Sequence, residues 1–153
     1  MKPGDLVDDF ELPDQTGTPR RLSSLLASGP VVLFFYPAAL TTGCTKESCH
    51  FRDLGAEFSA LGAMRVGISM DTVAKQAEFS EKHSFDYPLL ADPDGAVAKT
   101  FGVKRRFDLL RTKRVTFVIG TDRRIMGVIS SETSMDRHAN EALEILRASN
   151  APS

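Results

Sequence analysis

A single stretch of the sequence, residues 31–49, reads VVLFFYPAALTTGCTKESC. Its first six residues are apolar and mostly β-branched or aromatic, which is typical of a strand buried on both faces. Pro37 cannot donate to a strand ladder and therefore ends that strand. The stretch thus predicts a central strand, a turn, and a helix whose first turn contains Cys44.

Helical patterns continue beyond this stretch. Four apolar residues fall on one face of a single helix that Gly62 ends, namely Phe51, Leu54, Phe58 and Leu61. Three more helices are predicted behind residues that can cap a first turn. They run from Asp71 to about His83, from Asp94 to near Gly102, and from Ser134 onward. The last one carries an apolar face made of Met135, Ala139, Ala142 and Leu146.

Extended runs alternate with these helices at residues 64–70, 88–90, 115–119 and 125–131, the last two as a hairpin. Turn residues in the first thirty positions predict a further short β-hairpin at the N-terminus. This order indicates one α/β domain over residues 1–153, with a mixed central β-sheet flanked by helices. It fits a thioredoxin-like fold, and other α/β folds as well.

The composition excludes several classes of partner. The chain has 153 residues, 42% of them hydrophobic, and a net charge of -1, which gives no drive toward nucleic acid or an anionic membrane. Its longest apolar run, Val31–Tyr36, is far shorter than the about 20 residues that span a bilayer. Acidic residues follow Lys2, where a signal peptide would place an apolar stretch. We therefore expect a cytoplasmic protein.

The two cysteines, Cys44 and Cys49, are too few for a disulfide scaffold. The residues that follow the predicted strand lie at the carboxyl edge of the sheet, where open α/β sheets bind ligands. Unpaired N–H groups and the positive end of the helix dipole would stabilise a Cys44 thiolate there. The hydroxyl of Thr41, three residues earlier, is close enough to reach that sulfur.

The spacing of the two cysteines carries a geometric consequence. On an unbroken helix, five residues give a rise of about 7.5 Å and a Cα separation of about 8.5 Å. A disulfide tolerates at most about 7 Å, so Cys44 and Cys49 can bond only after local unwinding. That suits a bond made and broken in every cycle, but spacing leaves a core role for Cys49 equally open. A zinc site with His50 would lack a fourth ligand.

The motif Pro37-x-x-x-Thr41-x-x-Cys44 resembles the active-site pattern of the peroxiredoxins. Cys49, within Cys-Thr-x-Glu-x-Cys, resembles the atypical two-cysteine branch called bacterioferritin comigratory protein, or PrxQ. Other similar segments are Pro3-Gly4-Asp5, residues 10–13, Phe51-Arg52-Asp53, residues 87–92 and residues 114–119. On these motifs the chain is identified as a member of this family. It departs from the family pattern at Thr42 and Gly120, where relatives carry Pro and Asp.

The resemblance implies a thiol peroxidase that reduces hydrogen peroxide and organic hydroperoxides. Cys44 would become a sulfenic acid, and Cys49 would resolve it as an intramolecular disulfide. Thr41 and Arg114 would hold the peroxide and the thiolate, while Pro37 would shield the pocket from water. A thioredoxin-like reductant would return the electrons, with no metal, flavin or haem as cofactor. The protein would be a monomer or a weak homodimer.

Two other functions compete with this interpretation. One is a redox-regulated sensor or holdase chaperone, and the other is a thioredoxin-type disulfide reductase, whose usual Cys-x-x-Cys motif is absent. The basic segment 104–114 is either a solvated loop or a surface beside Cys44 that recruits an acidic reductase. The sequence leaves open whether Glu47 shapes the pocket, and it favours ordinary structural roles for His50, His83 and His138.

Overall fold

The computed structural model describes residues 1–104 and 112–150. Two short strands, β1 (Glu11–Pro13) and β2 (Pro19–Arg21), pair antiparallel as the predicted N-terminal hairpin. The main sheet contains β3 (Val31–Phe35), β4 (Met64–Ser69), β5 (Leu89–Ala91), β6 (Val115–Ile119) and β7 (Ile125–Ser130). Its order is β5-β4-β3-β6-β7, with β3, β4 and β5 parallel and with β6 antiparallel to both β3 and β7. The sheet is therefore mixed, as predicted.

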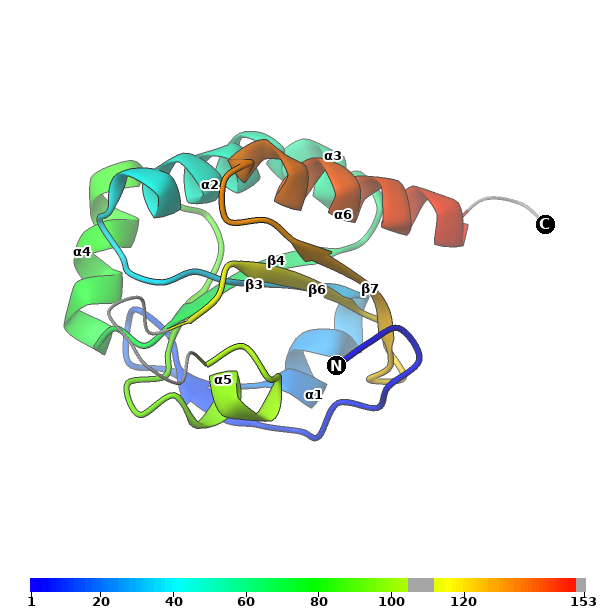
Figure 1. Cartoon of the computed structure of the whole chain (residues 1–153), viewed down its shortest axis with the longest axis horizontal. Helices are drawn as coiled ribbons and strands as arrows, with labels where there is room; N and C mark the ends of the chain where they lie inside the picture. The colour runs from blue at the N-terminus through cyan, green and yellow to red at the C-terminus, as the bar shows by residue number, and fades with distance from the viewer. Residues whose placement is uncertain (105–111, 151–153) are drawn as a thin grey trace.

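Helices cover both faces of the main sheet (Figure 1). On one face lie α2 (Thr42–Asp53), α3 (Gly55–Ala60) and α6 (Met135–Asn150). On the other lie α1 (Leu22–Leu25), continued by the 3-10 turn η1 (Leu26–Ser28), and α5 (Ala96–Thr100). The helix α4 (Val73–His83) lies beside one end of the layers. No helix within the described ranges is long and apolar enough to cross a membrane.

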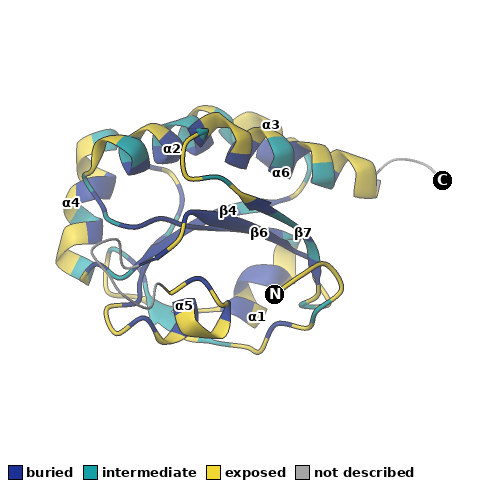
Figure 2. Cartoon of the chain, viewed as in Figure 1, coloured by how far each residue is buried: buried dark blue, intermediate teal, exposed yellow. Residues whose placement is uncertain are grey.

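The central strand β3 contributes side chains to the core on both faces of the sheet. Leu33 and Phe35 pack among the side chains under α1 and α5, whereas Val32 and Phe34 pack under α2, α3 and α6. This alternation follows from the two-residue period of a strand. All five residues of β3 are buried, and Figure 2 shows the same for most of the sheet. The predicted apolar face of α6 is buried as well.

The helix predicted through residues 51–61 is wrong in one respect, because it is two helices. At Leu54 the backbone leaves helical geometry (φ -95°, ψ 18°), so α2 ends at Asp53 and α3 begins at Gly55. The apolar spacing continues across this break because both helices pack on the same side of the sheet. Gly62, in the left-handed region with φ +69°, follows α3 and ends it as predicted.

One of the predicted helix caps is also wrong, and another is shared between two carboxylates. Thr72 caps α4 by accepting the Lys75 N–H, whereas the carboxylate of Asp71 accepts from the backbone of Ala39 instead. Gly95 is the N-cap residue of α5, but the carboxylate of the predicted Asp94 does accept from the N–H of Ala96, its first residue. The next two N–H groups donate to Asp92. The side chain of Asp71 thus has a tertiary partner that local sequence does not reveal.

Candidate active site

The turn between β3 and α2 places Cys44. Pro37 is buried at the end of the strand, and Leu40 adopts a left-handed conformation with φ 67° that redirects the chain. Thr41 then occupies the N-cap, so Cys44 is the third residue of α2 and lies in its first turn, as predicted. The thiol is fully buried and free. It therefore sits at the positive end of a helix and out of bulk water.

Arg114 lies beside Cys44, although it is 70 positions later in the sequence. In the antiparallel pairing of β3 with β6, Phe35 lies opposite Val115, so Arg114 stands at the carboxyl end of β3. Its Nη2 donates to Cys44 Sγ at 3.3 Å, and only 6% of the residue is exposed. A permanent cation is thus held against the sulfur in a shielded place, where its field is strong.

Gly43 makes room for this cation. A Cβ atom at Gly43 would lie 3.3 Å from Arg114 Nη2 and 3.7 Å from Met135 Sδ. Because Gly43 has no side chain, the guanidinium of Arg114 can lie against it and still reach Cys44, the next residue. This gives a packing reason for a glycine in the first turn of α2, where it would otherwise weaken the helix.

Glu47 shares the guanidinium with Cys44. Its Oε1 accepts from Arg114 Nη1 at 3.0 Å, and the side chain is fully buried one turn after the cysteine. Burial raises the pKa of Glu47 to about 8, because desolvation outweighs the attraction of Arg114. The carboxyl is therefore largely protonated near neutral pH, which leaves the charge of Arg114 available to the sulfur.

His138, which the sequence suggested was an ordinary residue, completes a buried polar group with Glu47. Its Nε2 lies 2.9 Å from the carbonyl of Ser131 and 3.5 Å from Glu47 Oε2, while its Nδ1 lies 2.7 Å from Thr116 Oγ1. Because a carbonyl only accepts, Nε2 carries a proton. Burial lowers the pKa of His138, which keeps the ring neutral.

Cys49 lies further along the same unbroken helix, with its thiol free and partly buried. Its side chain packs against the cluster of buried residues under α2, α3 and α6. Burial raises the pKa of the Cys49 thiol. Since α2 is continuous from Thr42 to Asp53, both cysteines occupy the helical geometry in which they are too far apart to bond.

The hydroxyl of Thr41 is exposed and donates to the carbonyl of Ala38 at 2.8 Å, rather than to Cys44. The tight turn brings that carbonyl within reach, and it satisfies the donor. Of the basic segment 104–114, residues 105–111 lie outside the described residues, whereas Lys104 and Lys113 are exposed.

The arrangement can perform one kind of chemistry well. A buried thiol, a fixed guanidinium and the N–H groups of a helix start can attack an electrophile and stabilise the negative charge that leaves. The described residues contain no group of three or more His, Cys, Asp or Glu side chains placed to hold a metal ion.

Comparison with known proteins gives a consistent result. A model of the AhpC/TSA family matches residues 3–128. A protein of Mycobacterium tuberculosis named as a peroxiredoxin is 67% identical over 150 residues, or 97% of each chain. The crystal structure of peroxidoxin BcpB from that organism has a TM-score of 0.95 at 65% identity, over 99% of each chain. The Xanthomonas campestris bacterioferritin comigratory protein has a TM-score of 0.84 at 30% identity, over 92% of this chain and 91% of that one. These similarities confirm the thioredoxin-like fold.

Proposed function

The chain belongs to the peroxiredoxin family and is a peroxidase, and on this premise we propose that Cys44 reduces hydrogen peroxide and organic hydroperoxides. The observation that carries the proposal is the 3.3 Å contact from Arg114 Nη2 to Cys44 Sγ. The relative from Xanthomonas campestris is described through its alkyl peroxide reduction activity, which supports organic hydroperoxides as substrates here.

In the first step, the Cys44 thiolate attacks one peroxide oxygen. A sulfur–oxygen bond forms as the oxygen–oxygen bond breaks, and the other oxygen leaves as water or an alcohol after it takes up a proton. The product is the Cys44 sulfenic acid. Negative charge moves from sulfur to the departing oxygen, and the guanidinium of Arg114 lies where it can stabilise both.

The remaining site residues would prepare this step. Glu47 would fix the orientation of Arg114 through their 3.0 Å hydrogen bond. Pro37, buried at the strand end, would exclude water beside the sulfur. Thr41, exposed at the mouth of the turn, would turn its hydroxyl from Ala38 toward an incoming peroxide.

In the second step, the Cys49 thiol attacks the sulfenic acid. A disulfide forms between Cys44 and Cys49, and water leaves. The first turns of α2 must unwind for the sulfurs to meet, at a cost of about a few kcal/mol in hydrogen bonds and helix-dipole energy. That cost makes the disulfide easier to reduce than a structural one.

In the third step, a thioredoxin-like dithiol would reduce the disulfide through a mixed disulfide and itself become oxidised. Both redox equivalents then reside in sulfur, so the cycle needs no bound cofactor. The free thiols of Cys44 and Cys49 in this structure correspond to the reduced state that begins the cycle.

A turnover assay with thioredoxin, thioredoxin reductase and NADPH tests the proposal. We expect peroxide-dependent oxidation of NADPH by the wild type and none by Cys44→Ser, whose hydroxyl cannot take up the oxidation. A sensor or a holdase chaperone would not turn over continuously. Retention of more than a few per cent of the rate by Cys44→Ser would overturn the assignment of the nucleophile.

A further inference from the structure

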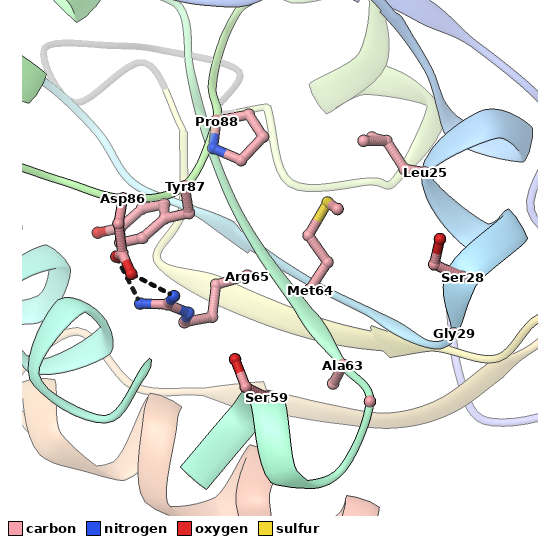
Figure 3. Close-up of a pocket in the computed structure, with 11 residues that line it drawn as sticks. Leu25, Ser28, Gly29, Ser59, Ala63, Met64, Arg65, Asp86, Tyr87 and Pro88 are labelled. Atoms are coloured by element: carbon pink, nitrogen blue, oxygen red, sulfur yellow. Dashed lines mark hydrogen bonds and ion pairs between the residues drawn. The ribbon is translucent and has the colours of Figure 1, made fainter. Parts of the chain in front are cut away.

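The side chains of Arg65 and Tyr87, which lie outside α2, form hydrogen bonds to the second half of that helix. Figure 3 shows them: Arg65, near the start of β4, and Tyr87, just before β5, lie side by side next to Asp86. Among the described residues, neither forms a hydrogen bond with the side chain of Cys44 or Arg114. Both instead donate to backbone carbonyls of α2.

Arg65 caps the end of the helix. Its Nη1 donates to the carbonyls of Phe51 at 3.0 Å and Arg52 at 3.4 Å, and the residue is only 7% exposed. The last carbonyls of a helix have no partner within it, and a cation there also complements the helix dipole. Asp86 binds the same guanidinium through both its carboxylate oxygens, at 2.9 and 3.0 Å.

The junction between α2 and α3 leaves space for this guanidinium. A Cβ atom at Gly55 would lie 3.1 Å from Arg65 Nη2 and 3.2 Å from Nη1. The glycine therefore lets Arg65 approach the helix end closely enough to bond its carbonyls. Gly55, the first residue after the break between α2 and α3, is thus also the residue that makes room for the cap by Arg65.

Tyr87 holds a carbonyl earlier in the same helix. Its hydroxyl donates to the carbonyl of Ser48 at 2.6 Å, and the residue is almost fully buried. The guanidinium carbon of Arg65 lies 5.0 Å from the centre of the Tyr87 ring, so the two side chains also attract each other. Together they hold α2 from residue 48, next to Cys49, to its end.

We propose that Arg65 and Tyr87 form a clamp that sets how readily α2 unwinds, and that they thereby act as positioning residues for the resolving step. This inference rests on the proposed Cys44–Cys49 disulfide. The segment that must unwind runs from Cys44 to about residue 51, and the clamp bonds the carbonyls of Ser48 and Phe51 in its second half. A cavity of about 310 Å³ borders Arg65 and Tyr87 on the side shown in Figure 3.

The clamp therefore favours the reduced protein. Its hydrogen bonds to α2 are made while the helix is intact and are lost when the helix opens. A weaker clamp should make the disulfide form more readily and resist reduction more strongly. It should also divert less sulfenic acid to sulfinic acid, because Cys49 arrives sooner.

Tyr87→Phe is the cleanest test, because it removes only the hydroxyl and keeps the ring. The Cys44–Cys49 pair is equilibrated in dithiothreitol redox buffers, trapped by alkylation and quantified by mass spectrometry. Loss of one buried hydrogen bond predicts about a fivefold shift toward the disulfide, which corresponds to a potential more negative by about 20 mV. Tyr36→Phe is the matched control, since its hydroxyl donates to Gln76 of α4 and not to α2.

Arg65→Met provides a second variant, which keeps the stem of the side chain but frees the carbonyls of Phe51 and Arg52. It should shift the equilibrium in the same direction and further, whereas Asp86→Asn, which leaves those donors in place, should shift it less. Equal behaviour of Tyr87→Phe and Tyr36→Phe would overturn the clamp. Absence of a Cys44–Cys49 disulfide in the wild type would instead overturn the proposed function, and the clamp's role in resolution with it.

Discussion

Arg114 Nη2 lies 3.3 Å from Cys44 Sγ although 70 positions separate the two residues. The antiparallel pairing of β6 with β3 causes this, because the start of β6 meets the carboxyl end of the strand that leads to Cys44. The same guanidinium binds the buried Glu47, so one cation serves two acidic groups.

Arg114→Ala should slow the attack of Cys44 on peroxide by at least about 10²-fold, as expected when a fixed charge is lost from a transition state. The chain has no Trp, so rapid quenching followed by thiol alkylation and mass spectrometry measures the rate. Arg137→Ala is the control, because Arg137 is an exposed residue that pairs with Glu141 one turn away. A rate within threefold of the wild type would mean that Arg114 does not contribute to the attack on peroxide.

Cys49→Ser should leave the first attack on peroxide nearly unchanged and stop catalytic cycling with a dithiol protein. Its sulfenic acid has no thiol beside it, so it should proceed to sulfinic acid more readily than in the wild type. Mass spectrometry after one and after several equivalents of peroxide measures both species. A variant that fails to react at all would show that Cys49 has a different role.

Glu47→Gln should change how stability depends on pH. Because the pKa of Glu47 is raised to about 8 in the folded protein, the folded state keeps a proton that the unfolded state releases near pH 4.5. Stability from this group is therefore complete below pH 4.5 and is lost as the pH rises to 8, with a slope approaching about 1.4 kcal/mol per pH unit. Glutamine does not ionise, so the variant should lack this loss.

The useful window for that comparison is pH 6.5 to 8, measured by urea unfolding. His138 works in the opposite direction, because its lowered pKa means that stability is lost as the pH falls below 6.5. Above pH 6.5, the effect of Glu47 on stability can therefore be measured without the opposing effect of His138. Parallel stability curves for the wild type and Glu47→Gln across this window would contradict the buried, protonated carboxyl.

Local patterns predicted the elements that place Cys44. The apolar run before Pro37 and the polar residues after it were enough to give strand, turn and helix, because each signal acts within a few residues. The break at Leu54 was missed, since apolar spacing is the same for one helix or for two that share a face. Gly55 was the signal available in the sequence, but the reason for a glycine there is the close approach of Arg65, which lies on β4.

The buried polar groups were harder to predict. Glu47 lies one turn from Cys44, but its burial depends on Arg114 and α6, which the sequence alone does not bring together. His138 stands four residues before Ala142 on the apolar face of the last helix, which was a usable sign of burial. Its partners on β6 and on the loop before α6 follow only from the packing of that helix.

Amide hydrogen exchange in the two redox states tests the central claim most directly, namely that α2 unwinds so that Cys49 can reach Cys44. After one equivalent of peroxide, residues 44–51 should lose protection, because the hydrogen bonds of α2 open when the disulfide forms. Strands β3 and β6 should keep their protection in both states. Equal protection of α2 in the reduced and oxidised proteins would mean that no intramolecular disulfide forms, and that the resolving thiol comes from another molecule.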